Sequence, residues 1–221
     1  RDQKLLYTIY SSKNQSFVPL SQIPKHMRTA TIAIEDKDFY KHGAIDLRGI
    51  SRSLVSIIIH QELQGGSTLT QQLVKNSLLT PERTILRKIK EVILAFATEA
   101  LYSKDKILEM YLNQIPYGGT TYGIEAAAQT FFGKKARDLT IAESALLAGL
   151  PEAPTTNSPL GSHPEYARKR QITILNKMYE QEYITRKEKD IAVKEILKFQ
   201  AFTNNISAPH FVLYIKDLLI K

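Results

Sequence analysis

The chain has 221 residues, no cysteine, and a hydrophobic fraction of 43%. These values suit one large domain, alone or with a small appendage, and exclude a chain that is disordered by composition. They also exclude disulfides, thiolate zinc sites and a cysteine nucleophile. The formal net charge of +8 fits a solvated basic surface, and equally a partner such as nucleic acid, anionic lipid or a phosphorylated substrate.

The first twenty residues contain two short apolar segments, Leu5–Tyr10 and Phe17–Leu20, on either side of the polar SSKNQ. This pattern predicts a short β-hairpin or an extended arm over residues 1–20. No run of uncharged apolar residues is long enough for a transmembrane helix. Because the chain does not begin with Met, we expect that a membrane anchor preceded it and has been removed.

The pattern becomes helical from Ser21 onward, so the fold is predicted to be mainly α. Capping signals, apolar spacing and prolines place the helices at residues 21–33, 47–63, 68–78, 84–102, 105–112, 140–150, 164–182 and 186–198. The segment PEAPTTNSPLGSHP (151–164) has four prolines and no periodicity. A connection of this length is expected to be functional or mobile.

Two adjacent acids, Glu35 and Asp36, follow the apolar helical stretch TATIAI. The helix dipole disfavours carboxylates at this end, so helix stability does not explain them. A carboxylate walled by aliphatic side chains and Phe39 can have a raised pKa and act as a base. An exposed helix terminus is the alternative, and His42 by itself indicates only a hydrogen-bonding partner for a neighbouring acid.

Basic residues are frequent from the end of the predicted helix 68–78 to the start of the predicted helix 84–102. Arg83, Arg87 and Glu91 are spaced to share one helix face, which by itself also fits an ordinary surface ion pair. Together the cations form a cluster of the kind that holds a phosphate or diphosphate. Its members are Lys75, Arg83, Arg87, Lys88 and Lys90.

The segment GGSTLTQQ (65–72) joins two predicted helices. The glycines permit close approach of a ligand, and Ser67 or Thr68 can cap the helix that follows. Thr70, Gln71 and Gln72 add neutral donors and acceptors suited to sugar hydroxyls and amides. Taken alone, the segment is also explained as a helix end followed by a helix start.

In combination, these segments resemble the peptidoglycan glycosyltransferase domain (transglycosylase, glycosyltransferase family 51) of class A penicillin-binding proteins. The resemblance covers roughly residues 20–180 and rests on five motifs in order. They are EDKDFYKHGA (35–44), where Ala44 replaces the family's final glycine, GGSTLTQQ (65–72), RKIKE (87–91), KDKILEMYLN (104–113) with the following YGG…YGIEAAAQTFFGK, and ESALLAGLPEAP (143–154).

The resemblance implies a lysozyme-like, two-lobed helical domain over residues 21–200, with a mobile jaw that faces the membrane. It implies a glycosyltransferase that joins a lipid-linked glycan strand to lipid II. The product has β-1,4 bonds, the anomeric configuration inverts, and polyprenyl diphosphate is released. The implied location is the extracytoplasmic face of the bacterial cytoplasmic membrane, and residues 201–221 resemble the start of a linker toward a transpeptidase domain.

The resemblance also implies roles for individual residues. Glu35 is the expected base, and Glu91 ranks second as a catalytic residue that holds cations or a divalent metal, or orients the substrate. Substrate-binding roles are expected for Asp36, His42, Arg52, Thr68, Gln71, Gln72, Lys75, Arg83 and Arg87. Lys104 and Asn113 are expected to be structural, and Glu143 to be the far half of a capping box.

Cofactor and partner expectations follow from the same resemblance. The resemblance is compatible with Mg²⁺ or Mn²⁺ bridging Glu91 and the diphosphate, and leaves open whether the metal is essential. The expected partners are lipid II, the lipid-linked glycan strand, the membrane surface and moenomycin-type inhibitors, with no nucleic acid.

Three alternatives stay open at this stage. The first is a lysozyme-like glycan hydrolase or lytic transglycosylase, which would also use a lone glutamate but has no diphosphate to hold. The second is a non-enzymatic module that binds an anionic ligand such as nucleic acid, against which the aromatics do not interleave with the basic residues. The third is an inactive scaffold, for which Ala44 is the only sign.

Overall fold

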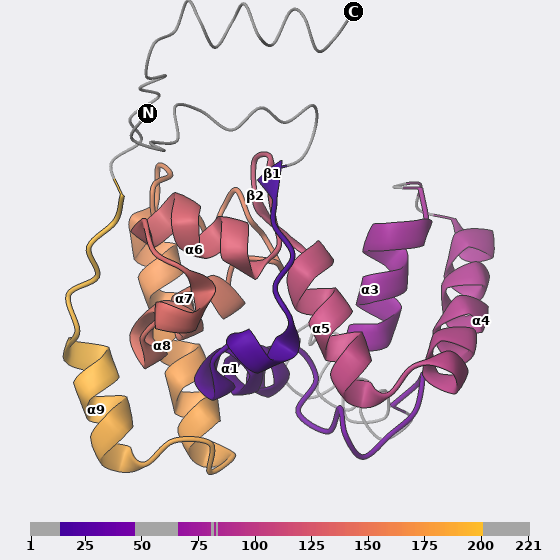
Figure 1. The fold of residues 1–221 in the computed structure, drawn as a ribbon, viewed down its shortest axis with the longest axis horizontal. Coiled ribbons are helices and arrows are strands. Elements are labelled where there is room, and N and C mark those ends of the chain that lie inside the picture. Colours follow the sequence, from indigo (N-terminus) through magenta and orange to yellow (C-terminus); the bar gives the residue numbers. More distant parts are fainter. Residues whose placement is uncertain (1–13, 47–65, 81, 83, 201–221) are drawn as a thin grey trace, which may run out of the picture.

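The computed structural model describes residues 14–46, 66–80, 82 and 84–200, and the chain there is mainly helical (Figure 1). The α-helices are α1 (Lys25–Glu35), α3 (Leu69–Leu78), α4 (Ile85–Leu101), α5 (Lys104–Gln114), α6 (Ile124–Phe132), α7 (Ile141–Ala148), α8 (Pro164–Glu180) and α9 (Arg186–Lys194). The strands are β1 (Asn14–Gln15), β2 (Pro116–Gly118) and β3 (Thr121–Tyr122), and short 3₁₀ helices cover Leu20–Gln22 and Ala136–Asp138.

The mainly α prediction is confirmed, and most predicted helices begin within a few residues of the observed ones. The reason is visible at their N-termini, where the expected caps form. Thr68, Thr140 and Thr185 each accept a hydrogen bond from the backbone three residues on, in complete capping boxes. The predicted helix at 47–63, the segment 1–13 and the segment 201–221 lie outside the described residues.

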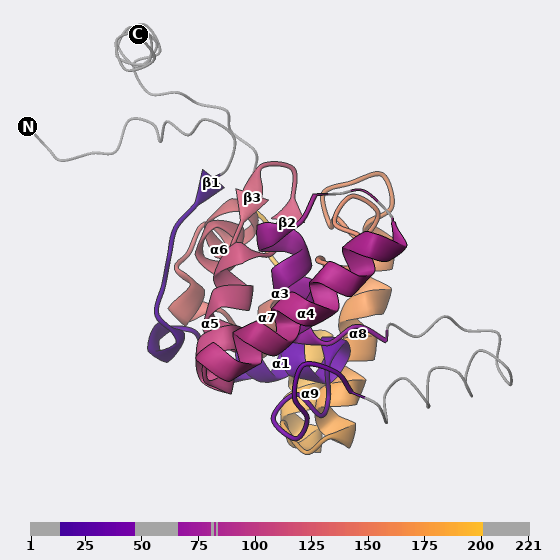
Figure 2. The ribbon, with the colours of Figure 1, turned by 90° about the vertical axis from the view of Figure 1, so that its right-hand side faces the viewer.

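The helices form two groups that meet at α5. In one group α3 packs against α4 and α5, and in the other α7 and α8 pack against each other and against α1. Figure 1 shows α3 and α4 on one side of the molecule and α6 to α9 with α1 on the other. Seen from the side in Figure 2, α4 crosses in front of α3 at the edge of the first group. Within the described residues, no helix is both long and apolar enough to span a bilayer.

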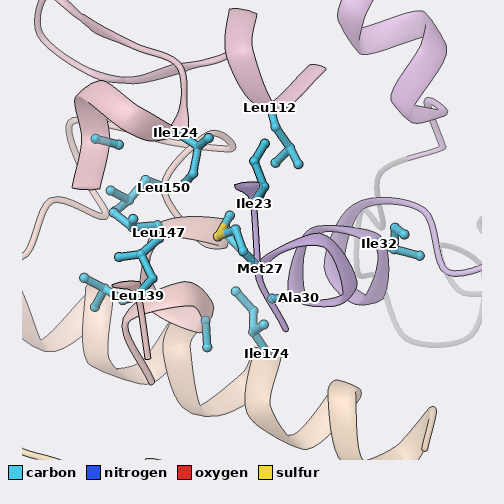
Figure 3. Close-up of a cluster of buried hydrophobic side chains, with 14 of the residues drawn as sticks. Ile23, Met27, Ala30, Ile32, Leu112, Ile124, Leu139, Leu147, Leu150 and Ile174 are labelled. Carbon is cyan, nitrogen blue, oxygen red and sulfur yellow. The ribbon is translucent and has the colours of Figure 1, made fainter. Parts of the chain in front are cut away.

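The hydrophobic core lies mainly in the second group and extends to α5. Met27, on α1, is completely buried, and Figure 3 shows it among side chains from several helices. The labelled neighbours in that view include Ile23, Leu112, Leu147 and Ile174. Burial of large apolar side chains on this scale is the main stabilising contribution to a domain of this size. It gives the end of α1 a rigid support.

The sequence analysis did not anticipate α6 or the small sheet. In the sheet, β3 lies between β1, which is parallel to it, and β2, which is antiparallel. Glycines bound α6 on both sides, because Gly123 and Gly133 have positive φ of 80° and 66° at its two caps. Because β1 belongs to the N-terminal arm, its pairing with β3 fixes the described part of the arm to a segment far away in the sequence.

Candidate functional site

Glu35 is the last residue of α1, where the apolar helix ends. Its Oε2 accepts a hydrogen bond from Gln72 Nε2 on α3, at 2.8 Å. Its other oxygen, Oε1, is buried and has no hydrogen-bond partner within the described part of the chain. Burial raises the pKa of the Glu35 carboxyl, although the Gln72 hydrogen bond and the charge of Arg170 oppose that rise. The result is a carboxylate with one oxygen held and one oxygen ready to take a proton.

Several groups from other elements influence Glu35 electrostatically. Arg170 and Lys177 lie on α8, and Tyr111 on α5 and Tyr117 on β2 are both 1% exposed. Arg170 forms an ion pair with Glu152 at 2.5 Å, in the loop that follows α7. Sequence reasoning did not select these side chains. The fourth motif, which contains Tyr111 and continues to Tyr117, and the fifth, which contains Glu152, pointed to this region without assigning these side chains a role.

Asp36 connects the end of α1 to the start of α3. Its Oδ1 meets His42 Nε2 at 2.6 Å, and its Oδ2 accepts from the Leu69 backbone N–H at 3.0 Å. His42 Nδ1 is 2.7 Å from the carbonyl oxygen of Gly43. Burial lowers the pKa of His42, but the hydrogen bonds to Asp36 and Gly43 and the Asp36 charge together raise it above its usual value. Each ring nitrogen thus faces an acceptor oxygen, an arrangement that favours the protonated imidazolium, and the contacts with Asp36 and Gly43 hold the loop that follows Glu35.

The N-terminus of α3 is built by Thr68 and Gln71. Thr68 Oγ1 accepts from the Gln71 N–H and donates to the Ala44 carbonyl oxygen at 2.9 Å, while Gln71 Oε1 accepts from the Thr68 N–H. Ala44 is itself buried, so its methyl group fits where the family motif has glycine. Gln71 is 4% exposed and its carbonyl is used for capping. In this structure Gln71 supports the helix, and its contact with a sugar remains a prediction.

Glu91 is a second buried carboxylate, 2% exposed on α4. Its Oε1 pairs with Lys88 Nζ one turn earlier, and the same ammonium donates to Ser67 Oγ at 3.1 Å. This bridge attaches α4 to the segment that precedes α3. Buried charges need such compensation. Glu91 is thus neutralised by a lysine, and Glu35 is not.

A metal site is not preassembled around Glu91. The described residues contain no group of three or more His, Asp or Glu side chains placed to share an ion. Mg²⁺ prefers octahedral oxygen ligands and commonly takes several from water and phosphate. The residues present supply one paired carboxylate, so the fit to a resident metal is poor and no chemical step is derived through one.

The predicted cations occupy different positions. Lys75 is exposed on α3 and lies within electrostatic reach of Glu35. Arg87 is half-buried on α4, and its buried Nε has no hydrogen-bond partner among the described residues. Arg52 and Arg83 lie outside the described residues.

Among the predicted site residues, the structure brings six into one network of contacts around the start of α3. They are Glu35, Asp36, His42, Thr68, Gln71 and Gln72.

One side of α4 carries apolar side chains that are unusually exposed. Ile89, Ile93 and Phe96 are 51%, 61% and 55% exposed, at a spacing that places them on one helix face. Contiguous exposed apolar surface of this kind marks an interaction site with protein or membrane. Figure 2 shows α4 crossing the face of the molecule that is turned toward the viewer.

Comparison with known proteins identifies the family. The transglycosylase family model matches residues 2–179. Penicillin-binding protein 1F of Bacillus subtilis is 46% identical over 98% of this chain and 29% of its own length, and penicillin-binding protein 1A of Neisseria lactamica is 43% identical over 96% of this chain and 26% of its own. The crystal structure of penicillin-binding protein 1A from Haemophilus influenzae aligns with a TM-score of 0.55 and 25% identity, over 93% of this chain and 21% of that one.

The chain thus spans less than a third of the length of these curated relatives. The family match, by contrast, extends over most of the chain and includes every described residue of the network around Glu35. The agreement in fold with a solved penicillin-binding protein is independent support. The chain belongs to the transglycosylase family, as a domain of the class A penicillin-binding protein type.

Proposed function

We propose that this chain polymerises lipid II into β-1,4-linked glycan strands, with Glu35 as the catalytic base. The observation that carries the proposal is the state of the Glu35 carboxyl. Burial raises its pKa, and its Oε1 is buried without a partner among the described residues, while Oε2 is held by Gln72. A base works best when its pKa is shifted toward the working pH and one oxygen is available for the proton.

The reaction is a single displacement with inversion. The C4 hydroxyl of lipid II attacks the anomeric carbon of the lipid-linked strand, and a new C–O bond forms as the bond to the diphosphate breaks. The hydroxyl proton passes to Glu35, and the diphosphate leaves with the bonding electron pair. One base is sufficient, because a diphosphate needs neutralisation of its charge more than a general acid.

The cations of the site suit that leaving group. Lys75 and Arg87, with Arg83, which lies outside the described residues, would bind the diphosphate. The Arg87 Nε has no hydrogen-bond partner among the described residues, which supports this role. Glu91 would hold Lys88 and the segment before α3 in place and would help to orient the substrate.

The substrate is a lipid, so the domain must work at a membrane surface. The exposed apolar side chains of α4 would enter the interfacial region of the bilayer, and the net positive charge of the chain would favour an anionic leaflet. The corresponding site is the extracytoplasmic face of the cytoplasmic membrane, where lipid-linked glycan is used.

The test of the chemistry is polymer formation from purified lipid II, with Glu35→Gln as the variant. Glu35→Gln keeps the size of the side chain and removes the base, so we expect a rate loss on the order of a hundredfold or more. Glu165→Gln, an exposed acid on α8, is the matched control and should keep the rate. Moenomycin-type inhibitors should block the wild type, and each assay should be run with Mg²⁺ and with EDTA.

A normal rate in Glu35→Gln would show that Glu35 is not the base. Release of soluble fragments from finished peptidoglycan, without polymer formation, would instead support the hydrolase alternative. The membrane contact is tested separately by vesicle flotation of the triple variant Ile89→Ser, Ile93→Ser and Phe96→Ser. Ile191→Ser on α9, which is 58% exposed, is the control and should still float with the vesicles.

A further inference from the structure

Two hydrogen bonds in series connect Tyr111 to Glu35 through the side chain of Gln72. The Tyr111 hydroxyl donates to Gln72 Oε1 at 3.2 Å, and Gln72 Nε2 donates to Glu35 Oε2 at 2.8 Å. Tyr111 is 1% exposed, and burial raises the pKa of its phenol well above the usual value. A buried hydroxyl proton needs an acceptor, and Gln72 Oε1 supplies it.

The orientation of the Gln72 amide follows from its two neighbours. An amide has a carbonyl at one corner and an NH₂ at the other. If the amide turned over, its carbonyl oxygen would face the Glu35 carboxylate, and two acceptors would meet without a proton between them. The hydroxyl of Tyr111 would then face the NH₂ and lose the acceptor for its own proton. Only the observed orientation satisfies both neighbours when Glu35 is ionised.

We propose that Tyr111 is a positioning residue for the glycosyl transfer, which acts through Gln72. By fixing the amide, Tyr111 keeps an N–H donor on Glu35 Oε2 and so leaves Oε1 as the oxygen that accepts the proton. The inference rests on the proposed function for the meaning of Glu35 as a base, but the contacts themselves do not depend on it. No sequence motif indicated this link, because the three residues come from α1, α3 and α5.

Other titratable groups also influence Glu35 electrostatically, so they contribute to any measured titration of its carboxyl. They are Lys75 on α3, Tyr111 on α5, Tyr117 on β2, Glu152 in the loop after α7, and Arg170 and Lys177 on α8. None of these groups is altered when the hydroxyl of Tyr111 is removed, except Tyr111 itself. A change confined to the link between Tyr111 and Gln72 can therefore be separated from the rest by a double-mutant cycle.

The primary experiment titrates Glu35 directly by carbon NMR of labelled glutamate carboxyls, with the Glu35 resonance assigned by its absence in Glu35→Gln. Gln72→Ala and Tyr111→Phe should each move the Glu35 midpoint upward, on the order of half a pH unit or more, since each weakens a hydrogen bond to a charged group. In the double variant, Tyr111→Phe should add nothing further, because its effect passes through Gln72. Tyr117→Phe removes an equally buried hydroxyl, and its effect should add to that of Gln72→Ala.

An unchanged midpoint in Tyr111→Phe would overturn the proposal, and so would an effect that persists in the Gln72→Ala background. Thermal unfolding of each variant shows whether it is folded. Phenylalanine is chosen over tryptophan at position 111 because the larger side chain would overfill the core. In the polymerisation assay, the acidic limb of kcat should move upward in Tyr111→Phe and the rate should recover at higher pH. A moved NMR midpoint with no effect of Glu35→Gln on polymerisation would keep the Tyr111 link and reject Glu35 as the base.

Discussion

Asn113, at the C-terminal end of α5, fastens the N-terminal arm to the rest of the domain. Its Oδ1 accepts from the Val18 N–H at 2.9 Å, and its Nδ2 donates to the carbonyl oxygens of Val18 and Glu109 at 2.9 and 2.8 Å. Its own carbonyl oxygen accepts from Gln15 Nε2 at 2.7 Å. The Asn113 side chain thus pairs with both backbone groups of Val18, as a neighbouring strand would. With 1% exposure, it has no access to water as a substitute.

We expect Asn113→Ala to lower the free energy of unfolding by about 3 kcal/mol. The change removes three side-chain hydrogen bonds, each of which contributes about 1 kcal/mol in a protein. Urea denaturation followed by circular dichroism measures the loss. Asn76→Ala, an exposed asparagine on α3, is the control and should change stability by less than about 0.5 kcal/mol.

Asn113→Asp separates the individual contacts. It keeps the acceptor for Val18 N–H but loses both donors, and it places a charge in a site that is 1% exposed. It should therefore destabilise the protein at least as much as Asn113→Ala at neutral pH. A cost below about 1 kcal/mol for Asn113→Ala would contradict this expectation, because the hydrogen bonds would then have been replaced by water at little cost.

Two further predictions concern backbone strain and pH. Gly123→Ala should cost about 3 kcal/mol in thermal unfolding, because its φ is +80° and a Cβ would lie 2.6 Å from the Asn113 carbonyl oxygen. The control Gly119→Ala, at φ +54° with open space around it, should cost only about 1 kcal/mol. The raised pKa of His42 should stabilise the fold fully below its ordinary value of 6.5, with the benefit lost as pH rises through the folded pKa. Urea unfolding across that range should show the decline in wild type and its absence in His42→Gln, and an equal decline in both proteins would reject the ion pair with Asp36.

The sequence predicts those parts of the site whose causes are local. The end of α1 at Glu35 follows from an apolar helix that stops at two acids, and the start of α3 follows from the capping box of Thr68 with Gln71. In each case the interacting groups are within four residues, so spacing alone carries the information. The same holds for the mainly helical fold, which the structure confirms.

The contacts between elements could not be predicted in this way. The NH₂ of Gln72 holds Glu35, 37 residues away, and its carbonyl oxygen accepts from Tyr111, 39 residues away, while its role in binding a sugar stays a prediction. Arg170 reaches the same carboxylate only because α1 and α8 pack together. Nothing in one sequence reports which faces of two helices meet. The short helix α6 was missed for a different reason, since its N-cap residue is Gly123 and no side chain caps its N-terminus.

The burial of Glu35 has a consequence for stability as well as for chemistry. Its pKa is raised, so the carboxyl favours the folded state below its unfolded value of 4.5 and loses that contribution as pH rises through the folded pKa. Ionisation of Glu35 therefore opposes folding, and its place at a helix end, where the dipole disfavours carboxylates, adds to the cost. Such a position persists only if surrounding structure over-determines it. The last turn of α5 supplies this support, because Tyr111 orients the network of Glu35 while Asn113, two residues later, holds the arm. Loosening of either attachment should then disturb the other, because Tyr111 and Asn113 share the last turn of α5.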